Sequence, residues 1–338
     1  MKKVVVVGKR QAALVDASDL VPVGNWVVVK VHAAPLCAEY KSFVGGAQNG
    51  WLGHEAAGEV VAVAQPGRVK VGDRVVAMPL YGCGCCALCL SGDYIHCQQQ
   101  PDFTAATGQT EGRATMAQYI LKQDWLLMPI PEGMSYERGA LACCGLGPSF
   151  GAMQTMGVSA FDTILITGLG PVGLGAIVNA HFRGARVIAV ESVPWRVERA
   201  RAMGVTAVLD PRDEDALARI IELTGGRGTD CALECSGNVR AERLCVDATR
   251  RKGKIAFVGE CYDDLTLRIS PDMLRKGLTL IGSWHYNLND YSKIVQVIQE
   301  SPLIDQLISH IIPMSEIQAA FELSASHETA KIILHPWE

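Results

Sequence analysis

The sequence lacks the features that would mark a membrane, secreted or nucleic-acid-binding protein. No run of about 18 uncharged apolar residues is present, so no transmembrane helix is expected. The apolar run Val4–Val7 is too short for the core of a secretory signal peptide. The 338 residues carry a formal net charge of −4, which argues against nucleic acid as a main partner. These absences favour a cytoplasmic protein without a membrane partner.

Disulfide bonds are also not expected, although the chain has 12 cysteines. A chain of this length can bury a core without covalent cross-links and has room for about two domains. In a reducing cytoplasm its thiols stay free to bind metal. We find no internal repeat and no low-complexity tract in the sequence.

Four of the cysteines follow a regular spacing, C-x2-C-x2-C-x7-C. They are Cys83, Cys86, Cys89 and Cys97. Three thiolates at every third position, with a fourth after a short lobe, can enclose one ion tetrahedrally, which predicts a closed structural zinc site. Four free cysteines or two disulfides are the alternatives, and the regular spacing disfavours both. Cys85 is out of phase and is not expected to bind.

The pattern of apolar residues changes near residue 160. Before it, β-branched runs at 26–31, 58–63 and 74–78 are separated by Gly, Pro and Asp, as in antiparallel strands. After it, strand-like runs at 163–167, 187–191, 230–234, 254–259 and 278–282 follow one another. Helical patterns such as 194–203 and 213–224 separate the earlier ones, which predicts βαβ units and a parallel sheet. Another helical pattern at 290–300 and a strand-like run at 331–334 come last.

These patterns predict an α/β protein in which one domain is inserted into another. Residues 1–146 and 286–338 are expected to form a mostly antiparallel β domain. Residues 147–285 are expected to form a doubly wound domain with a parallel sheet.

A glycine-rich motif, G-x-G-x-x-G, follows the first strand of the parallel sheet. Its residues include Gly168, Gly170, Pro171, Val172 and Gly173. A strand precedes the motif and an apolar helical pattern, 172–182, follows it, as in dinucleotide-binding folds. The glycines allow a tight turn and close approach to a pyrophosphate, and the helix N-terminus offers N–H groups to it. The alternative is a helix-packing turn without a ligand.

The choice between NAD and NADP depends on the next strand. Glu191 ends that strand, 23 residues after Gly168, where a carboxylate accepts hydrogen bonds from ribose hydroxyls and repels a 2′-phosphate. NAD is therefore expected. Arg196 lies five residues further on and could instead accept a phosphate.

A second group of possible metal ligands has no local spacing that would identify it. His54 and Glu55 lie between strand-like segments, Cys37 lies in an earlier loop, and Cys143 and Cys144 lie near the domain junction. From the residues alone, an isolated His or Cys is more often structural than a ligand.

The chain resembles the zinc-containing medium-chain alcohol and polyol dehydrogenases over nearly its whole length. The segment Gly53-His54-Glu55, the four-cysteine lobe and the 168–173 motif occur in the order and spacing of that family, as do segments 230–237 and 330–334. The resemblance implies a GroES-like catalytic domain and a Rossmann domain.

The resemblance also implies a catalytic zinc site at Cys37, His54 and Cys144, with Glu55 beside the metal. Cys144 is preferred to Cys143 because an aromatic residue follows it six positions later, as in the family. Lys331, in the final strand, is implied to face the cofactor pyrophosphate.

One departure from the family concerns the first ligand. The usual C-x-[S/T]-D is replaced by Cys37-Ala38-Glu39-Tyr40. We expect Glu39 to border the metal cleft and to move the alcohol proton, with water as the alternative. Tyr40 could supply a hydrogen bond to His54.

The resulting expectation is a zinc- and NAD-dependent dehydrogenase that oxidises a secondary alcohol of a polyol, cyclitol or sugar derivative. It would hold two zinc ions per chain, and the family suggests a homodimer or homotetramer. A zinc-independent reductase of the same superfamily and a non-catalytic nucleotide sensor are the alternatives.

Overall fold

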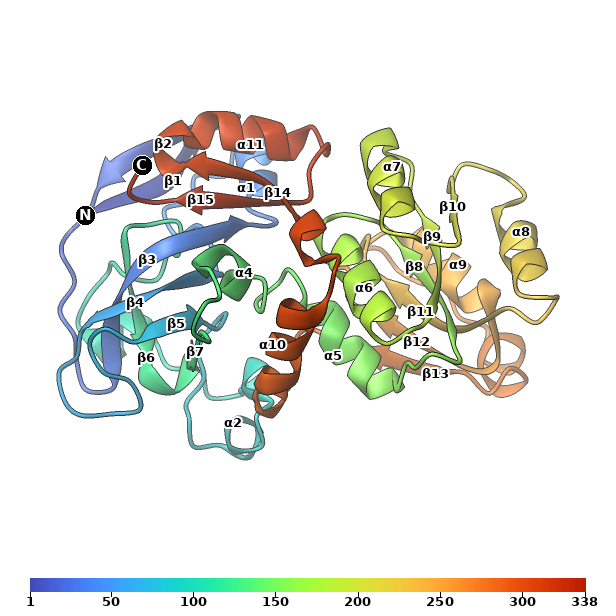
Figure 1. Ribbon diagram of the computed structural model, residues 1–338, viewed down its shortest axis with the longest axis horizontal. Helices are drawn as coiled ribbons and strands as arrows, with labels where there is room; N and C mark the ends of the chain where they lie inside the picture. Colours follow the sequence, from blue (N-terminus) through green and yellow to red (C-terminus); the bar gives the residue numbers. More distant parts are fainter. The chain divides into compact units, whose positions relative to one another are not determined.

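A computed structural model describes residues 1–338, and the chain divides into two compact units, seen in Figure 1. The first unit comprises residues 1–145, 287–300 and 308–338, and the second comprises residues 146–286 and 301–307. No helix combines the length and apolar character that a membrane span needs.

The first unit is built mainly from β-strands. Its elements are β1 (Lys2–Gly8), β2 (Gln11–Asp16), β3 (Trp26–Leu36), α1 (Tyr40–Gly45), β4 (Ala56–Ala62), β5 (Arg74–Ala77), α2 (Ala87–Leu90), α3 (Phe103–Thr107), β6 (Tyr119–Gln123), β7 (Leu127–Pro129), α4 (Tyr136–Ala140), α10 (Tyr291–Glu300), β14 (Ile308–Pro313), α11 (Ile317–Ala325) and β15 (Lys331–His335). Seven strands form one sheet in the order β14-β15-β3-β4-β5-β7, with β6 also paired to β3. Only the β14–β15 pair is parallel within this sheet.

Strand β3 organises this unit because both of its faces are buried. Val27, Val29 and Val31 pack into the main hydrophobic core, whereas Trp26 and Val28 pack into a smaller cluster on the other face. This is the alternation that a strand period of two requires. The last strand of the chain, β15, pairs antiparallel with the end of β3.

The second unit is a doubly wound α/β fold. Its elements are α5 (Gly147–Met156), β8 (Thr163–Thr167), α6 (Pro171–Phe182), β9 (Arg186–Val190), α7 (Pro194–Ala202), β10 (Ala207–Leu209), α8 (Ala216–Leu223), β11 (Thr229–Glu234), α9 (Val239–Ala248), β12 (Thr249–Phe257) and β13 (Thr279–Gly282). The six strands are all parallel, in the order β10-β9-β8-β11-β12-β13.

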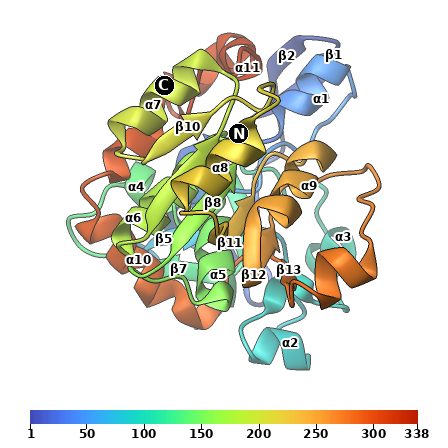
Figure 2. The same ribbon diagram turned by 90° about the vertical axis from the view of Figure 1, so that its right-hand side faces the viewer.

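Helices cover both faces of the parallel sheet. Helices α5 and α6 lie on one face and α8 and α9 on the other, as Figure 1 shows, and Figure 2 gives a second view of the six strands. Strands β8, β9 and β10 follow one another toward one edge of the sheet, and β11, β12 and β13 follow one another toward the other edge. Such folds bind ligands at the point where the order reverses, here between β8 and β11. The predicted fold class, a GroES-like unit with a Rossmann unit, is confirmed.

One segment differs from the domain assignment made from the sequence. Residues 301–307, placed there in the antiparallel domain, group with the second unit. The side chains of Ile304 and Leu307 are buried, and the carbonyl of Gln306 accepts a hydrogen bond from Arg199 Nε at 2.8 Å. Local packing therefore overrides the position of this segment in the sequence.

Candidate functional sites

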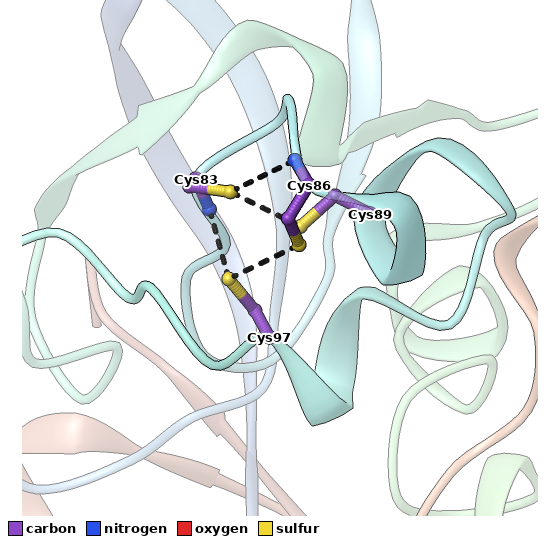
Figure 3. A group of neighbouring side chains, drawn as sticks. All are labelled: Cys83, Cys86, Cys89 and Cys97. Atoms are coloured by element: carbon purple, nitrogen blue, oxygen red, sulfur yellow. Dashed lines mark hydrogen bonds between the residues drawn. The ribbon is translucent and has the colours of Figure 1, made fainter.

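The four regularly spaced cysteines meet in a small lobe of the first unit. Figure 3 shows the side chains of Cys83, Cys86, Cys89 and Cys97 pointing toward one another, and their sulfur atoms all lie within 4.8 Å of one another. The Cys83–Cys89 and Cys86–Cys97 Sγ–Sγ distances are 3.8 and 3.9 Å. A tetrahedral zinc site with Zn–S bonds of about 2.3 Å has sulfur–sulfur edges of about 3.8 Å.

Backbone N–H groups in the lobe point at the sulfur atoms. The N–H of Cys86 donates to Cys83 Sγ at 3.2 Å, and that of Cys83 donates to Cys97 Sγ at 3.3 Å. Backbone hydrogen bonds lower the pKa of Cys83 to about 6, which favours the thiolate that metal binding needs. Sulfur atoms nearly 4 Å apart are not disulfide-bonded, and Cys85 is exposed and outside the group.

A second group of ligand atoms forms where β3 ends and β4 begins. The two strands are antiparallel, with Ala33 opposite Ala57, so the residue after β3 lies near the residues before β4. This brings Cys37 next to His54 and Glu55, and Cys144 completes the group. One ligand atom of each of these four residues lies within 4.8 Å of the others.

Glu39 holds two members of this group in place. Its Oε1 lies 2.9 Å from His54 Nδ1, and its Oε2 accepts the backbone N–H of Cys37 at 2.7 Å. The other ring nitrogen, Nε2, lies 3.1 Å from Cys144 Sγ. A carboxylate on Nδ1 leaves Nε2 directed at the thiols, which is how metal-binding histidines are usually oriented.

The role suggested for Tyr40 from the sequence is therefore filled by Glu39. The Tyr40 ring instead packs edge-to-face on His327, with ring centroids 5.6 Å apart. Glu39 is buried and lines the cavity beside His54, and its transfer of a proton remains a prediction.

The charges in this group depend on one another. A hydrogen bond from the Cys144 thiol lowers the pKa of Cys37 well below its usual value, and the same contact raises the pKa of Cys144. Burial opposes the protonation of His54, but the Glu39 carboxylate raises the pKa of His54 well above its usual value. The group thus favours one thiolate, that of Cys37, beside a protonated imidazole, that of His54.

Lys331, which the family resemblance implied would face the cofactor pyrophosphate, pairs with a carboxylate of this group. Its side chain is 0% exposed, and its ammonium is paired with the fully buried carboxylate of Glu55. Glu55 also accepts the backbone N–H of Cys144 at 3.0 Å. Burial raises the pKa of Glu55 to about 7 despite the opposing charge of Lys331. Contact of Lys331 with the pyrophosphate remains a prediction.

A cavity of about 260 Å³ opens beside His54 within the first unit. Its lining includes Glu39, Trp51, Tyr81, Arg113 and Lys122. The sequence analysis did not single out Tyr81 or Lys122, because neither belongs to a motif. Lys122 could have been noticed only as a charged residue directly after the apolar pair Ile120-Leu121.

The glycine-rich loop of the second unit has the backbone that a nucleotide cradle requires. Gly168 has φ +78°, and a Cβ there would lie 2.5 Å from Ser236 Cβ. A Cβ on Gly173 would lie 1.9 Å from the carbonyl oxygen of Gly168, whereas a Cβ on Gly170 would meet only Arg196 Nη1, at 3.9 Å. The space over Gly170 is thus open to a ligand. Helix α6 begins with Pro171 and Val172 and has no side-chain cap at its N-terminus.

Glu191 lies against this loop and hydrogen-bonds to its backbone. Its Oε2 accepts the N–H of Leu169 at 2.8 Å, and its Oε1 accepts the N–H groups of Ser192 and Val193. Arg196 Nη1 lies 3.8 Å from the same carboxylate. Gly168 and Glu191 both line a cavity of about 540 Å³ within the second unit.

Comparisons with known proteins identify the family of the chain. The family described as "Alcohol dehydrogenase GroES-like domain" matches residues 24–132, and the family described as "Zinc-binding dehydrogenase" matches residues 171–300. Sorbitol dehydrogenase of Bacillus subtilis is 33% identical over 327 residues, covering 92% of this chain and 90% of the relative. An uncharacterised zinc-type alcohol dehydrogenase-like protein of Escherichia coli is 32% identical over 307 residues, covering 90% and 84%.

Solved structures share the fold over the full chain. An alcohol dehydrogenase of Thermus sp. ATN1 has a TM-score of 0.89 and 24% identity, covering 99% of both chains. An alcohol dehydrogenase of Thermotoga maritima has a TM-score of 0.83 and 26% identity, covering 99% and 98%. The chain therefore belongs to the zinc-type medium-chain alcohol dehydrogenase family and is an enzyme.

Proposed function

We propose that this enzyme oxidises a secondary alcohol group of a polyol, cyclitol or sugar derivative to a ketone, with NAD as the hydride acceptor. The observation that carries the proposal is the convergence of Cys37, His54 and Cys144 on one point, with His54 lining a cavity. Two thiols and an imidazole are zinc ligands, and three protein ligands leave one coordination position for a substrate. This donor set argues against the zinc-independent reductase and against a non-catalytic sensor.

The residues of the site fit a zinc ion, with Cys37, His54 and Cys144 as the ligands. Glu55 is near enough to be a fourth donor, but its carboxylate is already paired with Lys331. When bound, zinc would polarise the hydroxyl oxygen of the substrate and NAD would accept the hydride. Binding zinc is also expected to draw the proton from Cys144, since thiolates are the binding form.

The protein's own part in the reaction is mainly to hold these groups rigidly. Glu39 orients the ring of His54 and the backbone at Cys37 through its two carboxylate oxygens. Lys331 neutralises Glu55, so that this acid does not add an unpaired charge to a buried site. Because both Glu39 oxygens are already bonded, its contacts support a positioning role more directly than a relay of protons.

The preference for NAD over NADP is proposed from Glu191. A carboxylate at the end of β9, beside the glycine-rich loop, would accept the ribose hydroxyls of NAD and repel a 2′-phosphate. The N–H groups at the start of α6 would face the pyrophosphate. Arg196 is drawn toward Glu191 by the ion pair between them, which supports the same preference.

The polyol class is proposed from the names of the relatives. Besides sorbitol dehydrogenase, a D-arabitol-phosphate dehydrogenase of Enterococcus avium is 28% identical over 97% of this chain. An erythritol/L-threitol dehydrogenase of Mycolicibacterium smegmatis is 28% identical over 91% of it. The polar side chains lining the cavity beside His54 suit a molecule with several hydroxyl groups.

A test combines metal analysis with turnover. Purified protein would be assayed for the reduction of NAD and of NADP with hexitols, inositols and aminocyclitols, and its zinc content measured in parallel. We expect zinc-dependent reduction of NAD with at least one polyol, and loss of that activity in His54→Ala without loss of the fold. Turnover that persists after zinc is removed would instead favour the reductase, and no turnover with zinc and NAD bound would favour the sensor.

A further inference from the structure

The cavity beside His54 contains two cationic side chains that pair with no carboxylate. The Arg113 guanidinium stands 5.0 Å from the centroid of the Trp51 ring and 6.0 Å from that of Phe103. The Lys122 ammonium stands 4.4 Å from the centroid of the Tyr81 ring and donates to the carbonyl of Leu80. Their partners are therefore aromatic faces and one backbone oxygen. Both side chains line the same cavity as His54.

Lys122 is the more informative of the two because it is buried. Its side chain lies on β6 and is 5% exposed, yet one hydrogen bond serves its three N–H donors. Burial lowers the pKa of Lys122 to about 7, and the nearby thiol of Cys143 offsets this only in part. Burying a charge without a paired acid costs free energy. The hydrogen bond to the Leu80 carbonyl does not explain why an ammonium is buried here, because a neutral donor could also bind that oxygen. The Lys122 ammonium is thus a buried donor that has no carboxylate partner within the protein.

The one acidic side chain in the cavity wall does not fill this need. Glu39 uses one oxygen for His54 and the other for the backbone of Cys37. The Glu39 carboxylate therefore interacts with the candidate metal centre and not with the cations of the cavity. Arg113 and Lys122 are the Arg and Lys side chains of the cavity wall.

We propose that this cavity binds an anionic group of the substrate, a phosphate or a carboxylate, between Lys122 and Arg113. The inference rests on the proposed function, because it places the hydroxyl to be oxidised at the metal centre. The substrate class then narrows to small polyols or sugar derivatives that carry one anionic group, in keeping with a cavity of about 260 Å³. The anionic group itself is unchanged by the reaction, in which the carbinol carbon gives a hydride to NAD and its hydroxyl loses a proton.

The kinetic test compares matched pairs of substrates. A neutral hexitol, its phosphate monoester and the corresponding sugar acid would be assayed with the wild type, Lys122→Met, Lys122→Arg and Lys30→Met. Lys30 is the matched control because its ammonium also stands over an aromatic ring, 4.6 Å from the centroid of Trp337, but outside the cavity.

We expect kcat/KM of the wild type to be higher for one anionic substrate than for the hexitol by about tenfold or more, since a hydrogen bond to a charged group contributes ~1.5–3 kcal/mol. Lys122→Met should lower the ratio of anionic to neutral kcat/KM about 10- to 100-fold through KM, and Lys122→Arg should keep most of it. Lys30→Met should leave both rates unchanged. The phosphate and carboxylate arms identify which anion is recognised.

A binding measurement separates this inference from the proposed function. Inorganic phosphate and acetate would be titrated into the zinc-loaded protein by calorimetry, without turnover. Binding of either to the wild type and its loss in a folded Lys122→Met support the anion site even if no alcohol is oxidised. Equal binding by the two proteins, or an unchanged substrate ratio in Lys122→Met, would overturn it.

Discussion

A single carboxylate, that of Glu39, contacts two members of the candidate metal centre at once. Removing it should free the imidazole of His54 and the turn at Cys37. We predict that Glu39→Ala lowers zinc affinity by about 10- to 100-fold, as is usual when the partner of a ligand histidine is lost. Glu39→Gln keeps an oxygen for Nδ1–H and should lose less.

Competition with a graded chelator would measure this affinity for each variant. If Glu39 instead moves the alcohol proton, Glu39→Gln should retain zinc while kcat falls and its pH profile flattens. Wild-type zinc affinity in Glu39→Ala would rule out the positioning role.

Glu191 is predicted to set the cofactor preference. Replacing it with Ser removes both the ribose acceptor and the negative charge, so NAD should bind more weakly and NADP should be rejected less. Glu191→Gln removes the charge but keeps one acceptor oxygen, which can still bind the N–H of Leu169. Fluorescence titrations with NADH and NADPH would measure both affinities, and a wild type that prefers NADPH would disprove the assignment.

Contacts between residues far apart in the chain were the part of the site that the sequence predicted least well. The four-cysteine lobe could be predicted because its ligands lie within 15 residues and have a regular spacing. The group around His54 came only from the family resemblance, since Cys37 and Cys144 are 107 positions apart. The pairing of Lys331 with Glu55 spans 276 positions, and no local pattern indicates which carboxylate a buried lysine will meet.

At the scale of elements, the lobe that carries α2 depends on its metal more than on its own packing. It holds a four-residue helix and a short 3-10 turn, Tyr94–His96, neither of which is stable alone. Cys89→Ser should therefore lose one zinc per chain and lower Tm by at least about 4 °C, for a loss of ~2 kcal/mol.

Cys85→Ser is the matched control for this lobe, because Cys85 is exposed and outside the ligand group. It should keep the zinc content and Tm of the wild type. Calorimetry with metal analysis would compare the three proteins, and equal melting of Cys89→Ser and Cys85→Ser would contradict a structural zinc.

The elements themselves were predictable where their pattern was strong. Strand β8 has the predicted bounds, 163–167, and α6 begins one residue earlier than expected, at Pro171, which is a favoured first residue of a helix. Strand β14 was not predicted. It is half-buried at the edge of its sheet, so it lacks the continuous apolar run that marks the central strands.

For the whole molecule, we predict two zinc ions per chain with separable roles. His54→Ala should retain one zinc and lose turnover, Cys89→Ser should retain one zinc and lose stability, and the double variant should retain none. The two sites share no ligand, so their effects on Tm should be nearly additive. Metal analysis of the four proteins provides the test, and one zinc per chain in a fully active wild type would contradict it.

The pairing of β15 with β3 has a consequence for the order in which this enzyme is made. Strand β15 and its Lys331 leave the ribosome after every residue of the parallel-sheet unit, whereas Glu55 emerges long before. Until then the nascent chain has no cation for that carboxylate and no strand to cover the end of β3. The candidate metal centre around His54 is thus expected to mature last, and a ribosome-stalled chain should acquire its lobe zinc before it can close this second site.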